Sequence, residues 1–173
     1  MKINIETERL IVRPFNNQDA SALLSARNSE FVNRYNIYPQ VSLQEFRDEL
    51  NRTDANVFIL KDSGLPIGCL YIKDDPFRYQ TGSYEIAGWF DERFANHHFA
   101  SEALPCILDA VFEKDGVNRV AFHVFVKNGA SNRLMEKFGF KREGCLCEAL
   151  KDKFGEFVDI VIYSISKRDY KKL

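Results

Sequence analysis

The sequence predicts a mixed α/β domain, and three observations support this fold class. Segments rich in β-branched and aromatic residues recur along the chain between turn residues. Segments between several of these strands carry apolar residues at helical spacing. A strand, a helix and a strand follow one another over residues 84–126, which is the pattern of a right-handed crossover unit. The predicted order is one strand, two helices, three strands, a helix, a strand, a helix and two strands.

The N-terminal part is expected to form one strand and two helices. The strand covers residues 3–13, and the first helix covers about residues 18–28 with Asn17 as its cap. Ser42 and Glu45 stand three residues apart and form a capping-box pattern, which predicts the start of the second helix.

A hairpin and a further strand follow. Segments 56–62 and 65–73 flank Asp62-Ser63-Gly64, which is a tight-turn pattern and predicts a β-hairpin. The next strand covers residues 84–90.

The clearest helical pattern begins at residue 100. Its apolar stripe consists of Ala100, Ala103, Leu104, Ile107, Leu108, Val111 and Phe112. Gly116 is expected to end this helix. Pro105 conflicts with a start near Ala100, because proline in a helix interior costs about 3 kcal/mol or bends the helix. The helix therefore either bends there or begins later, near Glu102.

The C-terminal part is expected to add a strand, a short helix and two strands. The strand covers residues 118–126, and the helix covers 130–138 and ends at Gly139. The last two strands meet across a turn near Gly155. No repeat or linker interrupts the chain, so residues 1–173 are expected to form a single domain.

The amino-acid composition indicates which classes of protein are expected and which are not. Apolar residues make up 45% and charged residues 28%, which is typical of a soluble globular domain. The net charge is −1, so no overall field attracts nucleic acid. No apolar run approaches the roughly 20 residues that span a bilayer, and the N-terminus does not resemble a secretory signal. We expect a cytoplasmic protein with neither a nucleic-acid nor a membrane partner.

Four cysteines, at positions 69, 106, 145 and 147, are expected to be reduced thiols in such a chain. Cys145 and Cys147 form a Cys-x-Cys pattern on a predicted strand, so their side chains share one face. A zinc site needs further ligands at compatible spacing, and neither a second cysteine pair nor a His-x3-His pattern supplies them. No metal is therefore expected.

Five segments identify a resemblance by their content and their order. They are TERLIVRPF (7–15), YEIAGWF (84–90), ASEAL (100–104), NRV (118–120) and NGASNRLMEKFGFKREG (128–144). Together they resemble the GNAT superfamily of acyl-CoA N-acyltransferases, in its RimJ/RimL-like branch. The match covers essentially the whole chain, and the last segment is the most specific. It implies a twisted, mostly antiparallel sheet with helices on both faces and two neighbouring strands that splay apart.

The resemblance also implies a reaction. Acetyl-CoA, as co-substrate, inserts between the splayed strands, and the acceptor amine approaches from the opposite side. Glu85 matches a position where the branch often has an acidic residue that faces the acceptor, which suits a base. The alternative is a solvated carboxylate on a strand.

Ser131 matches the serine of the branch's N-x-x-S segment, which would protonate the departing thiolate. The alternative is a helix cap. Many family members use a tyrosine four residues later, and this chain has Met135 there, which favours Ser131. Asn128 matches a cofactor contact, with a turn residue as the alternative. A backbone N–H near Trp89 and Phe90 matches the donor to the thioester carbonyl.

The expected pyrophosphate loop departs most from the family pattern. The family has a glycine-containing loop whose N–H groups, together with the following helix N-terminus, bind the phosphates. This chain has Asn96, His97, His98, Phe99, Ala100 and Ser101 there, with no glycine. If His98 takes a positive φ, a non-glycine residue costs about 1–2 kcal/mol. Either a histidine contacts phosphate and acetyl-CoA still binds, or the site is eroded.

Tyr35, Tyr84 and Glu148 are the candidates for contact with the acceptor. The branch often has an arginine just before the acidic residue at position 148, where this chain has Cys147. We expect an N-acetyltransferase that acts on a small-molecule amine or a protein N-terminus. The alternative is a GNAT-fold binding module without activity. Exposed strand edges and residues such as Phe77 and Phe154 would permit a homodimer as well as a monomer.

Overall fold

The protein is a mixed α/β structure with an eight-stranded sheet, in the computed structural model, which describes residues 1–78, 80–152 and 154–172. The strands are β1 (Ile5–Glu6), β2 (Leu10–Pro14), β3 (Asn56–Leu60), β4 (Pro66–Asp74), β5 (Ser83–Phe90), β6 (Arg119–Phe125), β7 (Lys141–Lys151) and β8 (Phe157–Ser166). The helices are α1 (Ala20–Arg27), α2 (Glu30–Asn33), α3 (Leu43–Arg52), η1 (Glu92–Phe94), α4 (Phe99–Phe112), α5 (Gly129–Lys137) and α6 (Lys167–Tyr170).

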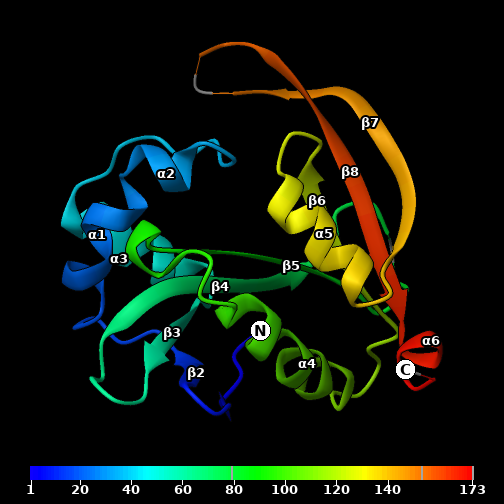
Figure 1. The fold of residues 1–173 in the computed structure, drawn as a ribbon, viewed down its shortest axis with the longest axis horizontal. Helices are drawn as coiled ribbons and strands as arrows, with labels where there is room; N and C mark the ends of the chain where they lie inside the picture. The colour runs from blue at the N-terminus through cyan, green and yellow to red at the C-terminus, as the bar shows by residue number, and fades with distance from the viewer. Residues whose placement is uncertain (79, 153, 173) are drawn as a thin grey trace. The chain divides into compact units, whose positions relative to one another are not determined.

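The strands follow the order β1-β2-β3-β4-β5-β6-β8-β7 in the sheet (Figure 1). β5 and β6 pair in parallel, and the pairs β1–β2, β2–β3, β3–β4, β6–β8 and β7–β8 are antiparallel. This confirms the predicted class and its mostly antiparallel sheet. The chain forms two compact units, and the first comprises Met1–Lys73 with Ala87–Val111. The second comprises Asp74–Ile86 with Phe112–Leu173.

In the first unit, α1 and α3 pack on one face of β3 and β4. Val57 and Ile59 on β3, with Cys69 and Tyr71 on β4, point into this core because alternate strand residues share a face. Phe58 points to the other face and meets Phe90 at 4.4 Å between ring centroids. Figure 1 shows α1–α3 on one side of these strands and α4 on the other.

A close approach of β4 and β5 in the first unit requires glycine. A Cβ atom on Gly68 would lie 2.2 Å from the carbonyl oxygen of Trp89, closer than real Cβ contacts come. Gly88 meets the Cys69 carbonyl oxygen in the same way, at 2.8 Å from its would-be Cβ. The two backbones therefore touch at a point where no side chain fits between them.

The N-terminal elements differ from the prediction in three places. The single expected strand is divided into β1 and β2 by a turn in which Thr7 N–H donates to the carbonyl of Leu10. The first helix begins at Ala20 and not at residue 18, and Asn17 is not its cap: Asp19 occupies the cap position. The third difference is the short helix α2, which was not predicted. The capping box of Ser42 and Glu45 at the start of α3 is confirmed.

Helix α4 begins at Phe99, where the N–H of Glu102 donates to the carbonyl of His98 at 3.0 Å. The later start near Glu102 was therefore wrong, and Pro105 lies inside the helix, where it cannot donate to the carbonyl of Ser101. The helix ends at Phe112, four residues before Gly116, which takes a φ of +77° in the following turn.

In the second unit, β6, β8 and β7 form an antiparallel group with α5 packed on one face. Phe122 of β6 contacts Phe140, just after α5, with ring centroids 5.2 Å apart. Tyr163 of β8 donates to Asn132 of α5 at 3.0 Å. Gly139 follows the helix with a φ of +70°, as predicted from its position after the apolar pattern.

β7 and β8 form a long hairpin that turns at Gly155, where φ is +83° (Figure 1). Nine of the eleven residues of β7 are exposed, and its register against β8 shifts between Arg142 and Gly144 and between Leu146 and Leu150. None of the helices formed by the described residues has the length and apolar character needed to cross a bilayer.

Candidate active site

The loop that precedes α4 takes backbone conformations that favour glycine, although it contains none. Asn96 and His98 take positive φ values of 62° and 63°. Left-handed residues are one component of the nests in which successive backbone N–H groups point toward an anion. The start of α4 adds N–H groups without intrahelical partners and the positive end of the helix dipole. The positive φ anticipated at position 98 is therefore present.

The TERL motif holds this loop in place from β2 and the turn before it. Arg9 donates through Nε to Glu102 at 2.7 Å and through Nη2 to the carbonyl of His97 at 3.0 Å. Its guanidinium also lies 4.4 Å from the centroid of the Phe99 ring. Thr7 donates through its hydroxyl to the same Glu102 carboxylate. Two motifs that are 93 residues apart in sequence, TERL and ASEAL, thus form one clamp on the loop.

Glu102 is held ionised by this clamp. Burial opposes the charge, but the hydrogen bonds from Thr7 and from the backbone and side chain of Arg9 outweigh it and lower the pKa of Glu102. The carboxylate in the first turn of α4 therefore helps to hold the loop in its conformation. Asn96, His97 and His98 are exposed.

The other site residues predicted in the first unit are Trp89, Phe90 and Tyr35, and the side chains of Trp89 and Phe90 pack against apolar neighbours. Trp89 is buried in the core with α1 and α3, and its ring lies 6.5 Å from Phe46. Phe90 packs between Phe58 and Phe99. Tyr35 is half-buried in the segment after α2. For Trp89 and Phe90, only the backbone N–H groups remain as candidates for the carbonyl donor.

In the second unit, Asn128 and Ser131 stand together at the start of α5. Asn128 is the cap: its Oδ1 accepts from the N–H of Ser131 at 3.2 Å. Ser131 is the third residue of the helix, so its hydroxyl is not the cap that its position suggested as an alternative. Asn132 donates to the carbonyls of Phe125, Val126 and Asn128. Together with Tyr163, Asn132 holds the loop that leads from β6 into α5.

Glu85 is paired with a residue that the sequence did not single out. Its Oε1 lies 3.1 Å from Nδ1 of His123 on the neighbouring strand β6. The two side chains are 9% and 10% exposed, so the pair is largely shielded from water. On the other side, Nε2 of His123 lies 3.8 Å from the buried Asp75 carboxylate. The available signal was a histidine inside the strand RVAFHVF, in which the other residues after Arg119 are apolar.

Asp75 lies on the far side of His123 from Glu85, and several hydrogen bonds hold its carboxylate in place. It accepts from the side chains of Arg78 at 2.6 Å and Ser83 at 2.9 Å, and from the N–H of Phe77 at 3.0 Å. Burial opposes its charge, and these hydrogen bonds with the nearby Arg78 cation overcome it and lower the pKa of Asp75. Phe77 covers the histidine, with its ring centroid 5.0 Å from the imidazole.

Glu85 and Ser131 lie on opposite faces of the sheet in the second unit. Phe122 and Tyr163 are register partners that share a face with α5, which carries Ser131. His123 follows Phe122 and therefore points to the other face, where it meets Glu85. Tyr84 precedes Glu85 and alternates to the face of α5. The β5–β6 pairs run from Ser83 to Glu85, so Glu85 is the last β5 residue in that pairing.

Two remaining positions bear on the predicted site. Met135, where many family members have a tyrosine, is buried within α5. Glu148 is exposed on β7 at a φ of +48°, and its backbone N–H donates to Asp159 at 2.8 Å. The side chain of Glu148 is therefore exposed to solvent at an irregular part of β7.

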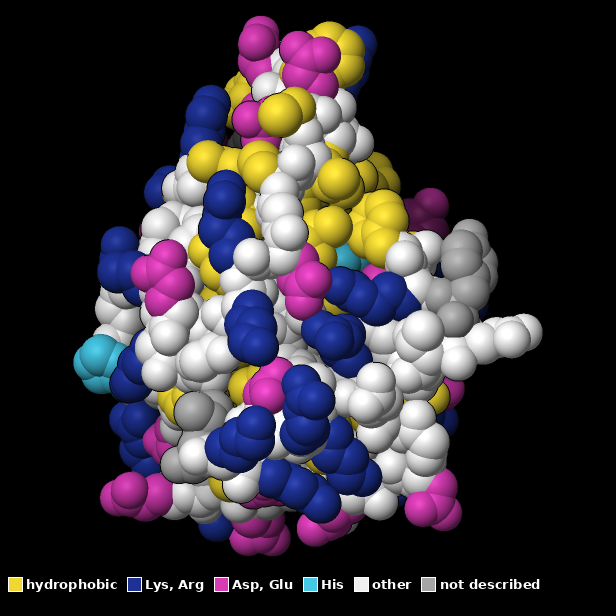
Figure 2. Space-filling view, turned by 90° about the vertical axis from the view of Figure 1, so that its right-hand side faces the viewer, with side chains coloured by type: hydrophobic (Ala, Val, Ile, Leu, Met, Phe, Trp, Pro, Cys, Tyr) yellow, Lys and Arg dark blue, Asp and Glu magenta, His cyan; other side chains and the backbone are white. Residues whose placement is uncertain are grey.

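A separate polar pocket of about 360 Å³ lies in the second unit and contains none of the predicted site residues. Arg119, Lys141 and Arg168 line it, and their charges are balanced by Glu143 and Asp169. The face drawn in Figure 2 has Lys and Arg side chains gathered on its lower part and hydrophobic side chains on its upper part.

Comparisons with known proteins agree with the motifs. Residues 9–141 match the family model described as an acetyltransferase (GNAT) domain. The uncharacterized N-acetyltransferase p20 of Bacillus licheniformis is 30% identical over 175 residues, which cover 95% of this chain and 96% of p20.

Solved structures show the same fold. An acetyltransferase of the GNAT family from Bacillus anthracis has a TM-score of 0.85 at 24% identity, over 96% of this chain and 99% of its own. RimL, the ribosomal L7/L12 alpha-N-protein acetyltransferase, in complex with coenzyme A has a TM-score of 0.82 at 20% identity, over 95% and 98% of the two chains.

Proposed function

Because the chain belongs to the GNAT family of acetyltransferases, as its motifs predicted, we propose that it transfers an acetyl group from acetyl-CoA directly to a primary amine. The observation that carries the proposal is the shielded Glu85–His123 pair at the end of the β5–β6 pairing. Such a pair can accept a proton from an ammonium group, and a neutral amine is what attack on a thioester requires.

Acetyl-CoA supplies the acetyl group as an activated thioester. The loop of Asn96, His97, His98, Phe99, Ala100 and Ser101 is proposed to hold the pyrophosphate. The positive φ values of this loop and the start of α4 behind it fit an anion, which supports this role. Asn128 is proposed to contact the pantetheine arm through its Nδ2, since its Oδ1 serves the cap.

The proton transfers are assigned to two faces. Glu85, backed by His123, accepts one proton from the acceptor ammonium and releases it to solvent. A backbone N–H near Trp89 and Phe90 stabilises the charge on the carbonyl oxygen. Ser131 donates a proton to the departing thiolate and regains one from the acylated nitrogen, so that an amide, CoA–SH and one released proton result. Approach of acceptor and co-substrate from opposite sides is consistent with the opposite faces of Glu85 and Ser131.

The acceptor is a small-molecule amine or a protein N-terminus. RimL is a ribosomal alpha-N-protein acetyltransferase, and the similarity of its fold supports a protein N-terminus as the acceptor. Tyr35 and Glu148 are the residues proposed to contact the acceptor. Tyr84 alternates to the face of α5, which is the side proposed for the co-substrate, so it is not proposed for this role. We further propose that residues 1–173 act as one domain, in the cytoplasm, as a monomer or homodimer.

The proposal is tested by calorimetric titration with acetyl-CoA. Binding is expected below about 1 mM, an affinity of about −4 kcal/mol or better. Absence of heat at that concentration would favour the alternative, a binding module that does not use acetyl-CoA.

Variants of the pair test the chemistry. Glu85→Gln and His123→Asn are expected to lower kcat about 100-fold or more, the usual contribution of general base catalysis. The affinity for acetyl-CoA should be unchanged in both variants, since neither residue is among those proposed to hold the co-substrate. Arg78→Lys, which keeps a cation beside Asp75, serves as the matched control and should retain kcat within about threefold. A wild-type kcat in Glu85→Gln would show that Glu85 is not the general base.

A further inference from the structure

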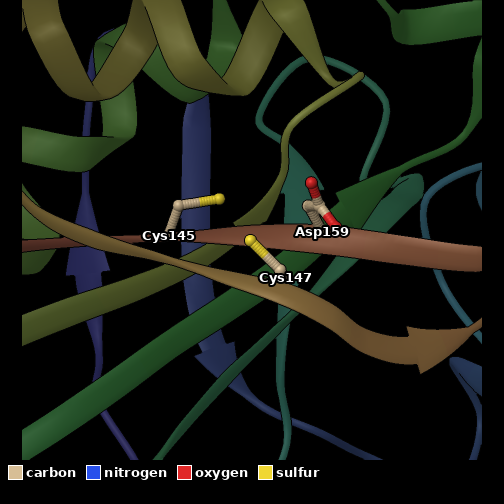
Figure 3. A group of neighbouring side chains, drawn as sticks. All are labelled: Cys145, Cys147 and Asp159. Atoms are coloured by element: carbon tan, nitrogen blue, oxygen red, sulfur yellow. The ribbon is translucent and has the colours of Figure 1, made fainter.

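Cys145, Cys147 and Asp159 form a cluster of potential metal ligands in the second unit. The two thiols lie at alternate positions of β7, and the carboxylate comes from β8. Their ligand atoms all lie within 4.8 Å of one another. Figure 3 shows the two cysteine side chains rising from the same face of β7, with Asp159 beside Cys147. We propose that this cluster binds a thiophilic divalent cation, of which Zn²⁺ is the representative.

The register of the hairpin brings the three residues together. Cys145 pairs with Val161, and Asp159 precedes Val161 by two residues, so all three ligands point to the same face. The sequence could not supply Asp159 as a third ligand, because it is 12 residues from Cys147 and reaches it only through the β7–β8 pairing.

The carboxylate is already oriented by a backbone contact. The N–H of Glu148 donates to Oδ1 of Asp159 at 2.8 Å. Glu148 takes a φ of +48°, at the place where the register of β7 shifts. The irregular strand therefore directs an amide at the back of the carboxylate and leaves Oδ2 for a cation, as outer hydrogen bonds do in metal sites.

The distances suit a tetrahedral ion after a small adjustment. Two sulfur ligands at about 2.3 Å from zinc stand about 3.8 Å apart at the tetrahedral angle. The observed separations of up to 4.8 Å would close by rotation of two exposed side chains. Three protein ligands leave a fourth position for water, which indicates an exchangeable ion rather than a buried structural one.

Charge and protons balance in a simple way. Two thiols and one carboxylate bind one Zn²⁺, two protons are released, and the complex has a charge of −1. The other cysteines do not compete. Cys69 is buried, and burial raises the pKa of its thiol. Cys106 lies on α4 in the first unit. The inference is independent of the proposed acetyl transfer.

Calorimetric titration of the reduced full chain with Zn²⁺, in two buffers of different ionisation enthalpy, tests the site. One equivalent is expected to bind with release of close to two protons. Cys145→Ser, Cys147→Ser and Asp159→Asn should each weaken binding by about tenfold or more, since each removes one of three ligands. Cys106→Ser and Glu156→Gln remove the same donor types elsewhere and should bind as the wild type does.

A second readout guards against loss of fold. In the presence of EDTA, the three ligand variants should have the same melting temperature as the wild type. Zn²⁺ should raise the melting temperature of the wild type and of the two control variants, but not that of the three ligand variants. Equal zinc affinity in Asp159→Asn and wild type, or binding without proton release, would overturn the site. So would a chain that binds no Zn²⁺ under reducing conditions and instead forms a Cys145–Cys147 disulfide in air.

Discussion

Replacement of His98 by glycine should stabilise the protein, because His98 has the backbone conformation of a glycine. Its φ is +63°. The left-handed conformation costs a residue with a Cβ about 1–2 kcal/mol. Glycine loses more chain entropy on folding, about 0.5–1 kcal/mol. The difference predicts a net gain of about 0.5–1 kcal/mol, or a rise of about 1–4 °C in Tm for a chain of this size.

His97 supplies the matched control, since it is the same residue type one position earlier without a positive φ. Alanine variants at both positions separate the loss of the imidazole from the backbone effect. Going from alanine to glycine should raise Tm at position 98 and lower it by a similar amount at position 97. Thermal unfolding followed by circular dichroism measures all four variants. If the change from alanine to glycine shifts Tm in the same direction at both positions, the argument that His98 is strained is refuted.

The same variants decide what the histidines do for the co-substrate. If His98 only fills the loop, His98→Gly should leave the Kd for acetyl-CoA unchanged or tighten it by up to about tenfold. A large loss in His98→Gly without any loss in His97→Ala would make His98 a phosphate ligand. Calorimetry at constant ionic strength is the measurement, because the contact with pyrophosphate is electrostatic.

Three further predictions concern other residues. Ser131→Ala should lower kcat about 100-fold and leave the Kd for acetyl-CoA unchanged; an unchanged kcat in steady-state assays would end its role as the acid. Arg9→Lys keeps the charge but loses the paired contacts to Glu102 and His97, so calorimetry should show about tenfold weaker acetyl-CoA binding. Because the pKa of Asp75 is lowered on folding, its carboxylate stabilises the fold above the ordinary value of 3.8, and this stabilisation is lost as the pH falls through the folded value. Urea unfolding should therefore separate wild type from Asp75→Asn at pH 7, with the difference shrinking below pH 3.8; a constant difference would contradict it.

Local signals predicted local structure well. The capping box at Ser42 and Glu45, the hairpin around Gly64 and the helix end at Gly139 each depend on a few consecutive residues, and each is confirmed. Errors occurred where a turn interrupts an otherwise strand-like pattern or where an element is very short. Thr7 bonds to Leu10 and divides the expected first strand, and α2 has only four residues.

The candidate site was predicted unevenly for the same physical reason. Motifs located Glu85, Asn128 and Ser131, whose roles remain predictions. They could not reveal that His123 meets Glu85, because that contact depends on the parallel register of two strands. Likewise, the loop lacks the glycines of the family pattern, yet Asn96 and His98 take positive φ values. The residue types alone suggested a disrupted loop, because they do not show which backbone conformations the residues adopt.

The outermost strand also bears on how the molecule behaves at high concentration. β7 ends the sheet order and is mostly exposed, so its outer edge could pair with a strand of another copy and begin an aggregate. Its two register shifts interrupt the regular row of backbone donors and acceptors, and its charged side chains oppose close pairing with another strand. A straight second strand would therefore find few consecutive partners. The bulged conformation that orients Asp159 also protects this edge against fibrous self-association.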